Sequence, residues 1–370
     1  MLLLNTKAYL DGAFENTDMR IENDKVTLIK KGITPEKDEQ VMDFAGDYLV
    51  PGFTDVHIHA FMGMDTMGGE EAVRHMSREL KKVGVQAFCP TTMSASPEDT
   101  LKALRGIKAV MDKPEKDGAT VLGAHMEAPF MSKEKCGAQL PEFFVLPTMA
   151  AFDEMTGECK KIVRLISLAP ELEGALEFIA ALSERGITVS LGHTSANAKT
   201  VHDAAEAGAT HVTHTFNAQT PLKHREPGVP GAALCDDRLY TEFIADGVHL
   251  HPDILRIAVR CKGKEKIVLI TDAMEAAGMP DGQYELGGQT VFVKDGAARL
   301  ESGTLAGSTL LLRRAVSNMA TWGIPFEEIV PMATQTPADS INVKSAPIAV
   351  GARPPFNRFN AQGQYIQTIL

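Results

Sequence analysis

The chain has 370 residues, which is enough for one large domain with a small additional one. It is 44% hydrophobic and 23% charged, as ordinary globular proteins are, and its net charge of −11 argues against a nucleic-acid surface, which needs a basic patch. No stretch approaches the roughly 20 apolar residues that span a bilayer, so we expect no membrane segment. The start has no signal-like leader, and the 5 cysteines are scattered, so we expect a cytoplasmic protein.

The first 50 residues indicate short strands separated by turns. Strand-like runs occupy Met1–Asn5, Ala8–Leu10 and Asp24–Leu28, and Asp11-Gly12 is typical of a hairpin turn. The tail, residues 348–370, returns to strand character. We therefore expect residues 1–51 and 345–370 to form a small β-sandwich domain built from both ends of the chain.

Between residues 52 and 344 strands and helices alternate. Apolar, β-branched runs predict eight strands, at Phe53–His59, Val85–Thr91, Thr120–Glu127, Ile162–Leu168, Ile187–Gly192, His211–Phe216, Thr241–Asp246 and Ile267–Asp272. Helical periodicity predicts helices at 70–83, 97–111, 149–161, 174–185, 196–207, 252–261, 307–322 and 325–334. A hairpin is expected at 287–299. This alternation predicts an α/β protein with a closed, TIM-like (β/α)₈ barrel. An open doubly wound sheet should carry a glycine-rich loop after its first strand, and none is present.

Ionisable residues gather where the expected strands end. Two histidines at alternate positions, His57 and His59, lie on one face at the end of the first strand. Alone, such a pair is often two solvated residues beside a turn. Further ionisable residues follow at or near the ends of other strands: Glu127, His193, His214, His249 and Asp272. Active sites of such barrels lie at this carboxyl-terminal rim, so a shared site is favoured.

Histidine nitrogens and carboxylate oxygens are ligands of divalent metal ions. Glu127, His193 and His214 supply three ligands and leave a position for water, as a hydrolytic metal requires. His57 and His59 are the candidates for a second ion that shares Glu127. We expect one or two ions per subunit, with Zn²⁺ first and Fe²⁺, Mn²⁺, Ni²⁺ or Co²⁺ also compatible.

Asp272 is the expected general base and acid. It follows the eighth strand, where it can take a proton from metal-activated water and return it to a leaving group. The alternative is an aspartate that caps a helix at a strand–loop junction. Its place at the rim favours catalysis.

The stretches that carry these residues resemble the amidohydrolase superfamily and, more narrowly, the N-acetylglucosamine-6-phosphate deacetylases. The resemblance covers essentially the whole chain. A His-x-His pair identifies only the superfamily. The deacetylases are indicated by Glu-x-Pro-Phe at 127–130, His-Arg-Glu-Pro-Gly at 224–228 and Thr-Asp-Ala-Met at 271–274, in this order. Other matching stretches are 51–59, 123–130, 191–194, 213–218, 246–249 and 304–308.

The resemblance implies a hydrolase of linear amides that converts N-acetyl-D-glucosamine 6-phosphate into D-glucosamine 6-phosphate and acetate. Metal-activated hydroxide would attack the acetyl carbonyl, with Asp272 as base and acid. The resemblance also implies contacts to the sugar or phosphate from Ala138, Gln139, Asn217, Ala218, Arg225, His249, Leu305, Ala306 and Gly307. Arg225 offers the bidentate cation that a phosphate favours. A homodimer is implied, in which the partner subunit contributes to the phosphate pocket.

Two positions depart from the family pattern. Ala128 follows the metal-binding glutamate where the family usually has glycine, and Gln139 stands where it usually has histidine. Glutamine donates hydrogen bonds but carries no charge near neutral pH. These departures leave the metal chemistry intact and bear on the sugar or the phosphate.

Three other functions fit the sequence less well. The same chemistry on N-acetylgalactosamine 6-phosphate is the nearest alternative. A cyclic amide is another, but it would be favoured by a metal-bridging lysine on the fourth strand, and residues 162–168 contain no lysine. A non-catalytic sugar-phosphate sensor would be indicated by loss of Asp272 or of a ligand, and none is lost.

Overall fold

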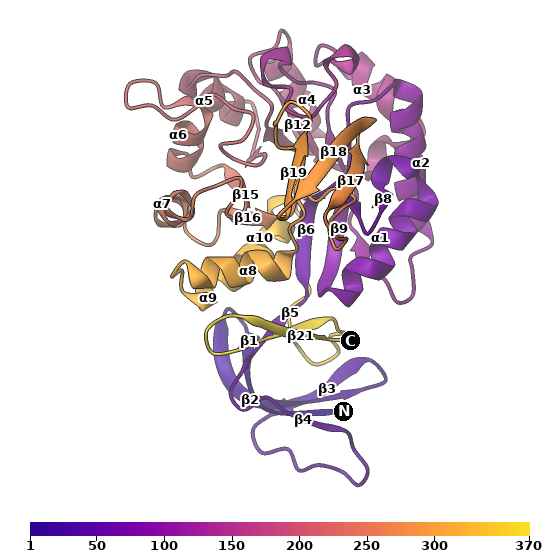
Figure 1. Cartoon of the computed structure of the whole chain (residues 1–370), viewed down its shortest axis with the longest axis vertical. Helices are drawn as coiled ribbons and strands as arrows, with labels where there is room; N and C mark the ends of the chain where they lie inside the picture. The colour runs from indigo at the N-terminus through magenta and orange to yellow at the C-terminus, as the bar shows by residue number, and fades with distance from the viewer.

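The computed structural model describes all residues from Met1 to Leu370, and its main feature is a parallel β-barrel surrounded by helices (Figure 1). The barrel strands are β6 (Phe53–Ile58), β9 (Val85–Thr92), β10 (Thr120–Val121), β11 (Ala124–Glu127), β12 (Val163–Leu168), β13 (Thr188–Leu191), β14 (His211–Val212), β15 (Tyr240–Ile244) and β16 (Ile267–Ile270). Successive strands pair in parallel, with β10 and β11 both beside β9. A parallel bridge between Ile58 and Ala273 joins the last strand position to the first. The predicted (β/α)₈ barrel is confirmed.

Helices cover the outside of this barrel. They are α1 (Glu70–Lys82), α2 (Pro97–Asp112), α3 (Met149–Thr156), α4 (Ala175–Glu184), α5 (Ala198–Glu206), α6 (Gly228–Cys235), α7 (Pro252–Lys262), α8 (Leu312–Thr321), α9 (Phe326–Ala333) and α10 (Gln335–Ser340). On α1, for example, Val73, Met76 and Leu80 recur at helical spacing and are buried. One cluster of 71 buried apolar residues includes strand and helix side chains, so the barrel and its helices share a core. None of the helices is both long enough and apolar enough to cross a membrane.

Both ends of the chain form a second sheet below the barrel (Figure 1). Its strands are β1 (Leu2–Leu10), β2 (Ala13–Glu22), β3 (Lys25–Lys30), β4 (Val41–Asp43), β5 (Tyr48–Pro51), β20 (Phe356–Phe359) and β21 (Tyr365–Ile369). Hydrogen bonds link them in the order β21-β20-β5-β1-β2-β3, with β4 beside β1. Ten buried apolar residues, among them Leu3, Met19 and Phe356, form a separate small core. We expected a small β-sandwich from the two termini, and the structure confirms an additional β-structure built from both ends, in the form of one sheet.

Several local elements differ from the prediction. The two strands expected at 1–5 and 8–10 are one strand, β1, because a bulge between Leu3 and Thr6 absorbs the irregular residues without breaking the pairing to β2. The hairpin expected at 287–299 is a three-stranded sheet of β17 (Gly282–Leu286), β18 (Gln289–Lys294) and β19 (Ala297–Leu300). Two very short strands, β7 (Ala60–Phe61) and β8 (Met64–Asp65), also form a separate pair.

Four helices also differ, among them α10, which we did not predict. Helix α8 begins at residue 312 and not at 307, because the backbone N–H of Ser308 donates to the carbonyl of Asp272 and holds this segment at the rim. Helix α3 ends at Thr156, and a 3₁₀ turn, Gly157–Ile162, replaces its expected last part. We did not predict α6, since its glycines and proline weaken the helical signal. Other 3₁₀ turns lie at Thr66–Gly68, Lys133–Lys135 and Pro141–Phe143.

The barrel and the terminal sheet meet closely at Gly84 and Asn357. Gly84 has a φ of +89°, and a β-carbon there would lie 1.9 Å from Asn357 Oδ1. The Asn357 side chain is buried and donates from Nδ2 to the Gly84 carbonyl at 3.0 Å. Thr368 in turn donates from Oγ1 to Asn357 Oδ1 at 3.0 Å. Only glycine leaves room for this contact.

Gly84→Ala is therefore expected to lower the free energy of unfolding by about 2–4 kcal/mol, since overpacking adds to the cost of the left-handed backbone. Denaturant unfolding at equilibrium measures the loss. Gly12→Ala is the matched control, because Gly12 has a φ of +88° and no atom within 4 Å of the added β-carbon. The control should lose only about 1–2 kcal/mol. Equal losses in the two variants would show that the contact with Asn357 contributes nothing.

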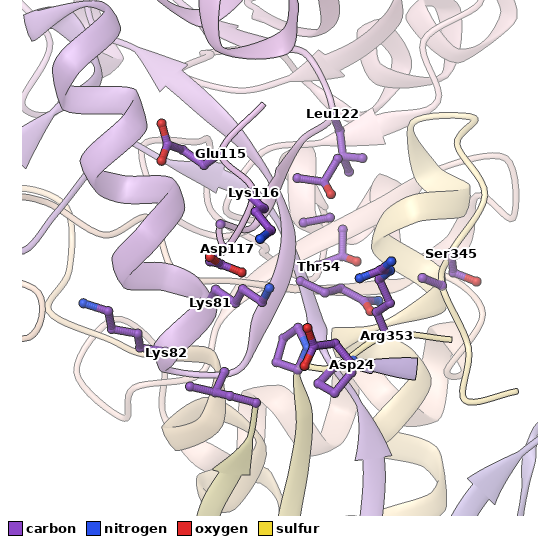
Figure 2. A pocket seen from close by; sticks show the side chains of 18 of the residues that line it. Asp24, Thr54, Lys81, Lys82, Glu115, Lys116, Asp117, Leu122, Ser345 and Arg353 are labelled. Carbon is purple, nitrogen blue, oxygen red and sulfur yellow. The ribbon is translucent and has the colours of Figure 1, made fainter. Parts of the chain in front are cut away.

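Two cavities lie at opposite ends of the barrel. One, of about 830 Å³, lies between the starts of barrel strands and the terminal sheet, where Lys81, Lys116 and Arg353 surround it together with Asp24 and Asp117 (Figure 2). Its charges are of both signs, and this end of such barrels serves stability. The other cavity, of about 480 Å³, lies at the carboxyl-terminal rim that the sequence predicts as the site of chemistry. Although it is smaller, it is the candidate site.

Candidate active site

The six residues predicted for metal binding and proton transfer lie together at the rim of the barrel, and all are buried. His57 is on β6 and His59 directly follows this strand, Glu127 ends β11, and the other three lie in turns after β13, β14 and β16: His193, His214 and Asp272. Parallel strands of a barrel end at the same rim. Residues far apart in the sequence therefore share one site.

The first cluster contains Glu127, His193 and His214. Glu127 Oε1 lies 3.2 Å from His193 Nε2 and 3.1 Å from His214 Nε2. The two Nε2 atoms are themselves 3.1 Å apart. A tetrahedral ion with bonds of about 2.0–2.1 Å to nitrogen and oxygen holds its ligand atoms roughly 3.3 Å apart. The three atoms therefore fit a divalent ion.

The second cluster contains His57 and His59 and uses the same glutamate. The Nε2 atoms of His57 and His59 are 3.3 Å apart. His59 Nε2 lies 3.1 Å from Glu127 Oε2, and His57 Nε2 lies 3.5 Å from Glu127 Oε1. Both oxygens of Glu127 thus face histidine nitrogens. This carboxylate belongs to both groups that have the composition of a metal site.

The hydrogen bonds behind two of the histidines also fit a metal. His193 Nδ1 lies 2.8 Å from the Lys135 carbonyl, which can only accept, so Nδ1 carries the proton. In the neutral ring Nε2 then presents a lone pair to the oxygen of Glu127. His57 is held similarly, because its Nδ1 lies 3.0 Å from Glu242 Oε2. Facing acceptors of this kind repel each other unless a proton or a metal ion lies between them.

The electrostatics of the site favour positive charge. Burial by itself lowers the pKa of His57, but the carboxylates of Glu127, Glu242 and Asp272 outweigh it and raise this pKa well above its usual value. For His59, burial is likewise outweighed by hydrogen bonds with Asp272 and Glu127, which raise its pKa to about 9. Buried carboxylates thus create a field that a bound cation would satisfy.

Asp272 lies beside the second cluster and lines the cavity. Its Oδ1 is 3.3 Å from His59 Nε2 and 3.5 Å from His57 Nε2. Burial raises the pKa of Asp272, but these two imidazoles lower it below the usual value, so the carboxylate is ionised, as a general base must be. No helix begins at Asp272, which excludes the helix-cap alternative.

Several residues at this rim have a backbone conformation that L-residues rarely adopt. They include Ala128 (φ +88°), His193 (φ +47°), His214 (φ +27°) and Asp272 (φ +50°). Such strain gathers at functional sites. The positive φ at position 128 also explains why the family usually has glycine there, because glycine takes a φ of this sign at no steric cost.

Most of the residues that the resemblance implies as substrate contacts line the cavity: Ala138, Gln139, Asn217, Ala218, His249, Leu305 and Gly307. Ala306 is fully buried and is not part of the lining. Arg225 lies on an exposed loop, where its guanidinium is 2.8 Å from His224 Nε2, and it does not line the cavity of its own chain. One chain therefore brings together most of the residues expected to contact the substrate. It does not bring Arg225, the cation expected to bind the phosphate, to its own cavity.

The structure also places four charged residues at the site that we did not predict. Three of them, Glu134, Lys135 and Arg299, line the cavity. No sequence signal distinguished these three, because they lie in loops or strands of mixed charge. Glu242 lies on β15 and is fully buried beneath the two histidine clusters. Its signal was a carboxylate within an otherwise apolar barrel strand.

Gln139 has a more specific position than the sequence suggested. Its Nε2 donates to Glu127 Oε2 at 2.7 Å, and its Oε1 accepts from the backbone N–H of Ser94 at 2.7 Å. The side chain is 4% exposed. Its amide is therefore oriented by Ser94 and directed at the carboxylate shared by both clusters.

Gln139→Ala is expected to weaken metal binding by about 10- to 100-fold, because it removes a hydrogen bond that orients a ligand. Competition between the protein and a chelator measures this change. If Gln139→Ala keeps its metal affinity and only raises KM, Gln139 serves the substrate alone.

Comparison with known proteins agrees with this geometry. A family model described as the amidohydrolase family matches residues 48–368. The chain is 36% identical over 334 residues to an N-acetylglucosamine-6-phosphate deacetylase of Lysinibacillus sphaericus, covering 90% of this chain and 86% of the relative. It is 39% identical over 305 residues to an N-acetylgalactosamine-6-phosphate deacetylase of Escherichia coli O157:H7, covering 80% and 79%.

A solved structure matches over the full length of the chain. It is an N-acetyl-D-glucosamine-6-phosphate deacetylase of Mycobacterium smegmatis, an aspartate-to-alanine mutant in complex with N-acetyl-D-glucosamine-6-phosphate. The TM-score is 0.90 at 30% sequence identity, and the match covers 100% of this chain and 97% of the other. The agreement therefore extends over the barrel and the terminal sheet together.

Proposed function

The chain belongs to the amidohydrolase family and is a hydrolase of its N-acetylglucosamine-6-phosphate deacetylase group, and from this premise we propose that it converts N-acetyl-D-glucosamine 6-phosphate into D-glucosamine 6-phosphate and acetate with a divalent ion. One observation carries the assignment of roles. The carboxylate of Glu127 joins two histidine clusters at the cavity, and Asp272 lies beside them. This arrangement can activate water next to a base.

Glu127, His193 and His214 would hold the principal ion, and His57 with His59 a second one. When bound, a divalent ion polarises the acetyl carbonyl and makes water a stronger nucleophile. We propose Zn²⁺ first, since two imidazoles and a carboxylate in tetrahedral spacing suit it. Fe²⁺, Mn²⁺, Ni²⁺ and Co²⁺ are compatible with the same donors.

Asp272 moves the protons of the reaction. Its ionised carboxylate takes a proton from the attacking water while the water oxygen bonds to the acetyl carbon. The bond between this carbon and the amide nitrogen then breaks, and Asp272 gives the proton to the departing nitrogen. The products are acetate and the free amine. His249 lines the same cavity and is oriented by Asp246 Oδ2, 2.7 Å from its Nδ1, so its Nε2 is available for the substrate.

The phosphate is proposed to bind between two copies of the chain. Arg225 is exposed and lies outside its own cavity, so a homodimer offers it a place in the cavity of the partner copy. Lys135 and Arg299 supply cations from the same chain. A phosphorylated sugar also fits a cytoplasmic enzyme, because such charged metabolites are kept inside cells.

The galacto epimer is the second candidate substrate. A relative named for N-acetylgalactosamine 6-phosphate is 39% identical to this chain, and the relative of Lysinibacillus sphaericus named for N-acetylglucosamine 6-phosphate is 36% identical. Overall identity therefore does not separate the two sugars. Since the proposed chemistry takes place at the acetamido group, both epimers fit the metal clusters and Asp272.

Acetate release from the two sugar phosphates and from unphosphorylated N-acetylglucosamine tests the proposal. The enzyme is loaded with Zn²⁺, and the kcat/KM values are compared. We expect the gluco phosphate to give the highest value and the unphosphorylated sugar the lowest. A higher value for the galacto phosphate would establish the second candidate. No acetate from any of the three by protein that holds its metal would contradict the assigned function.

A further inference from the structure

A buried carboxylate lies beneath both histidine clusters. Glu242, in the middle of β15, has no exposed surface, and its Oε2 lies 3.0 Å from His57 Nδ1 and 3.0 Å from the backbone nitrogen of His214. Its Oε1 lies 3.3 Å from His211 Nε2. It therefore contacts one member of each cluster from the side away from the cavity.

The burial of the Glu242 carboxylate requires a physical explanation. Taking a carboxylate out of water costs several kcal/mol unless its partners compensate for it. An apolar side chain would fill the interior of a barrel at no such cost. Besides His211, the partners of Glu242 are a ring nitrogen of His57 and the backbone N–H of His214, both predicted ligands. Two of the groups that offset the cost of burying Glu242 therefore belong to the metal site.

The bond to His57 decides how this histidine can act. A carboxylate accepts, so the proton of the neutral His57 ring lies on Nδ1 and the lone pair lies on Nε2. Nε2 is the atom that faces His59 and Glu127. Without Glu242 the neutral ring could turn or take the tautomer that carries its proton on Nε2, and in neither state does Nε2 offer its lone pair to a metal. His214 has no such support for its ring, because Glu242 reaches only its backbone.

We propose that Glu242 is a positioning residue that makes His57 a ligand and thereby creates the second cation site, while the first site stays largely independent of it. The inference rests on the proposed two-cluster metal centre and deepens it. Metal binding at the second site would thus depend on Glu242, a residue that touches neither the metal nor the substrate.

Metal binding tests this directly, without any measurement of turnover. The full-length protein is stripped with a chelator and equilibrated with Zn²⁺, and the ions bound per chain are measured over a range of free Zn²⁺. We expect two classes of site in the unchanged protein. Glu242→Leu should weaken the second class about 10- to 100-fold and leave the first within a few-fold. Glu242→Gln keeps an acceptor for His57 Nδ1 and should lose less.

Two further variants control the comparison. His57→Asn removes a ligand of the second site only, so its Zn²⁺ binding curve is the one expected when that site alone is lost. His211→Asn disturbs the same buried layer but leaves both contacts of Oε2, and it should bind two ions. The thermal unfolding temperature of each metal-free variant shows that the fold is intact.

Three results would overturn the inference: unchanged binding in Glu242→Leu, equal loss of both classes in a folded Glu242→Leu, or a single class in the unchanged protein. Failure of the proposed function would be seen separately, as absent acetate release by protein that binds its ions normally.

Discussion

Asp272→Asn is expected to lower kcat by a factor of about 10² to 10⁴, the usual contribution of a general acid–base group. Asparagine has the shape of aspartate, but it can neither take a proton from water nor return one to the leaving nitrogen. KM should change little, because the change is to proton transfer and not to sugar binding. Steady-state kinetics of acetate release at saturating substrate measures this loss.

The metal content of Asp272→Asn is the essential control. Asp272 is outside the two groups that have the composition of a metal site, so its ions should remain bound. The unfolding temperature should also stay close to that of the unchanged protein. If the variant loses its metal together with its activity, Asp272 acts as a ligand and its assignment as base and acid is wrong.

Glu127→Ala is expected to remove all bound metal and, with it, all measurable deacetylation. Its carboxylate is the one residue shared by the two clusters, so its loss leaves each with only two histidines. A bound ion would also lose a carboxylate that balances its charge in a buried site. Elemental analysis after dialysis, together with the acetate assay, measures both effects.

His57→Asn and Glu134→Gln are the control variants for Glu127→Ala. His57→Asn changes only the second cluster and should retain one ion per chain. Glu134 lines the same cavity but belongs to neither cluster, so Glu134→Gln should retain the full metal content. A Glu127→Ala protein that still binds one ion per chain would show that the two clusters do not share this ligand.

The sequence determined most of the architecture. Apolar, β-branched runs that alternate with helical periodicity specify parallel strands joined by helices, and their number specifies a closed barrel. Because the strands of such a barrel end at one rim, His57, Glu127 and Asp272 could be assigned to one site from their order alone. Short sequence motifs also predicted turns. The hairpin turn expected at Asp11-Gly12 is one example, and both of its residues have positive φ.

Only the tertiary structure decided how the site is supported. Glu242 and His57 are 185 residues apart, and no periodicity or spacing predicts which buried carboxylate meets which imidazole. Gln139 was expected as a substrate contact, but its loop turns its amide toward Glu127. Arg225 was expected in the pocket, and the chain leaves it on the surface. Patterns along the chain report which face of an element is buried, whereas these contacts depend on how separate loops and strands are placed relative to one another in space.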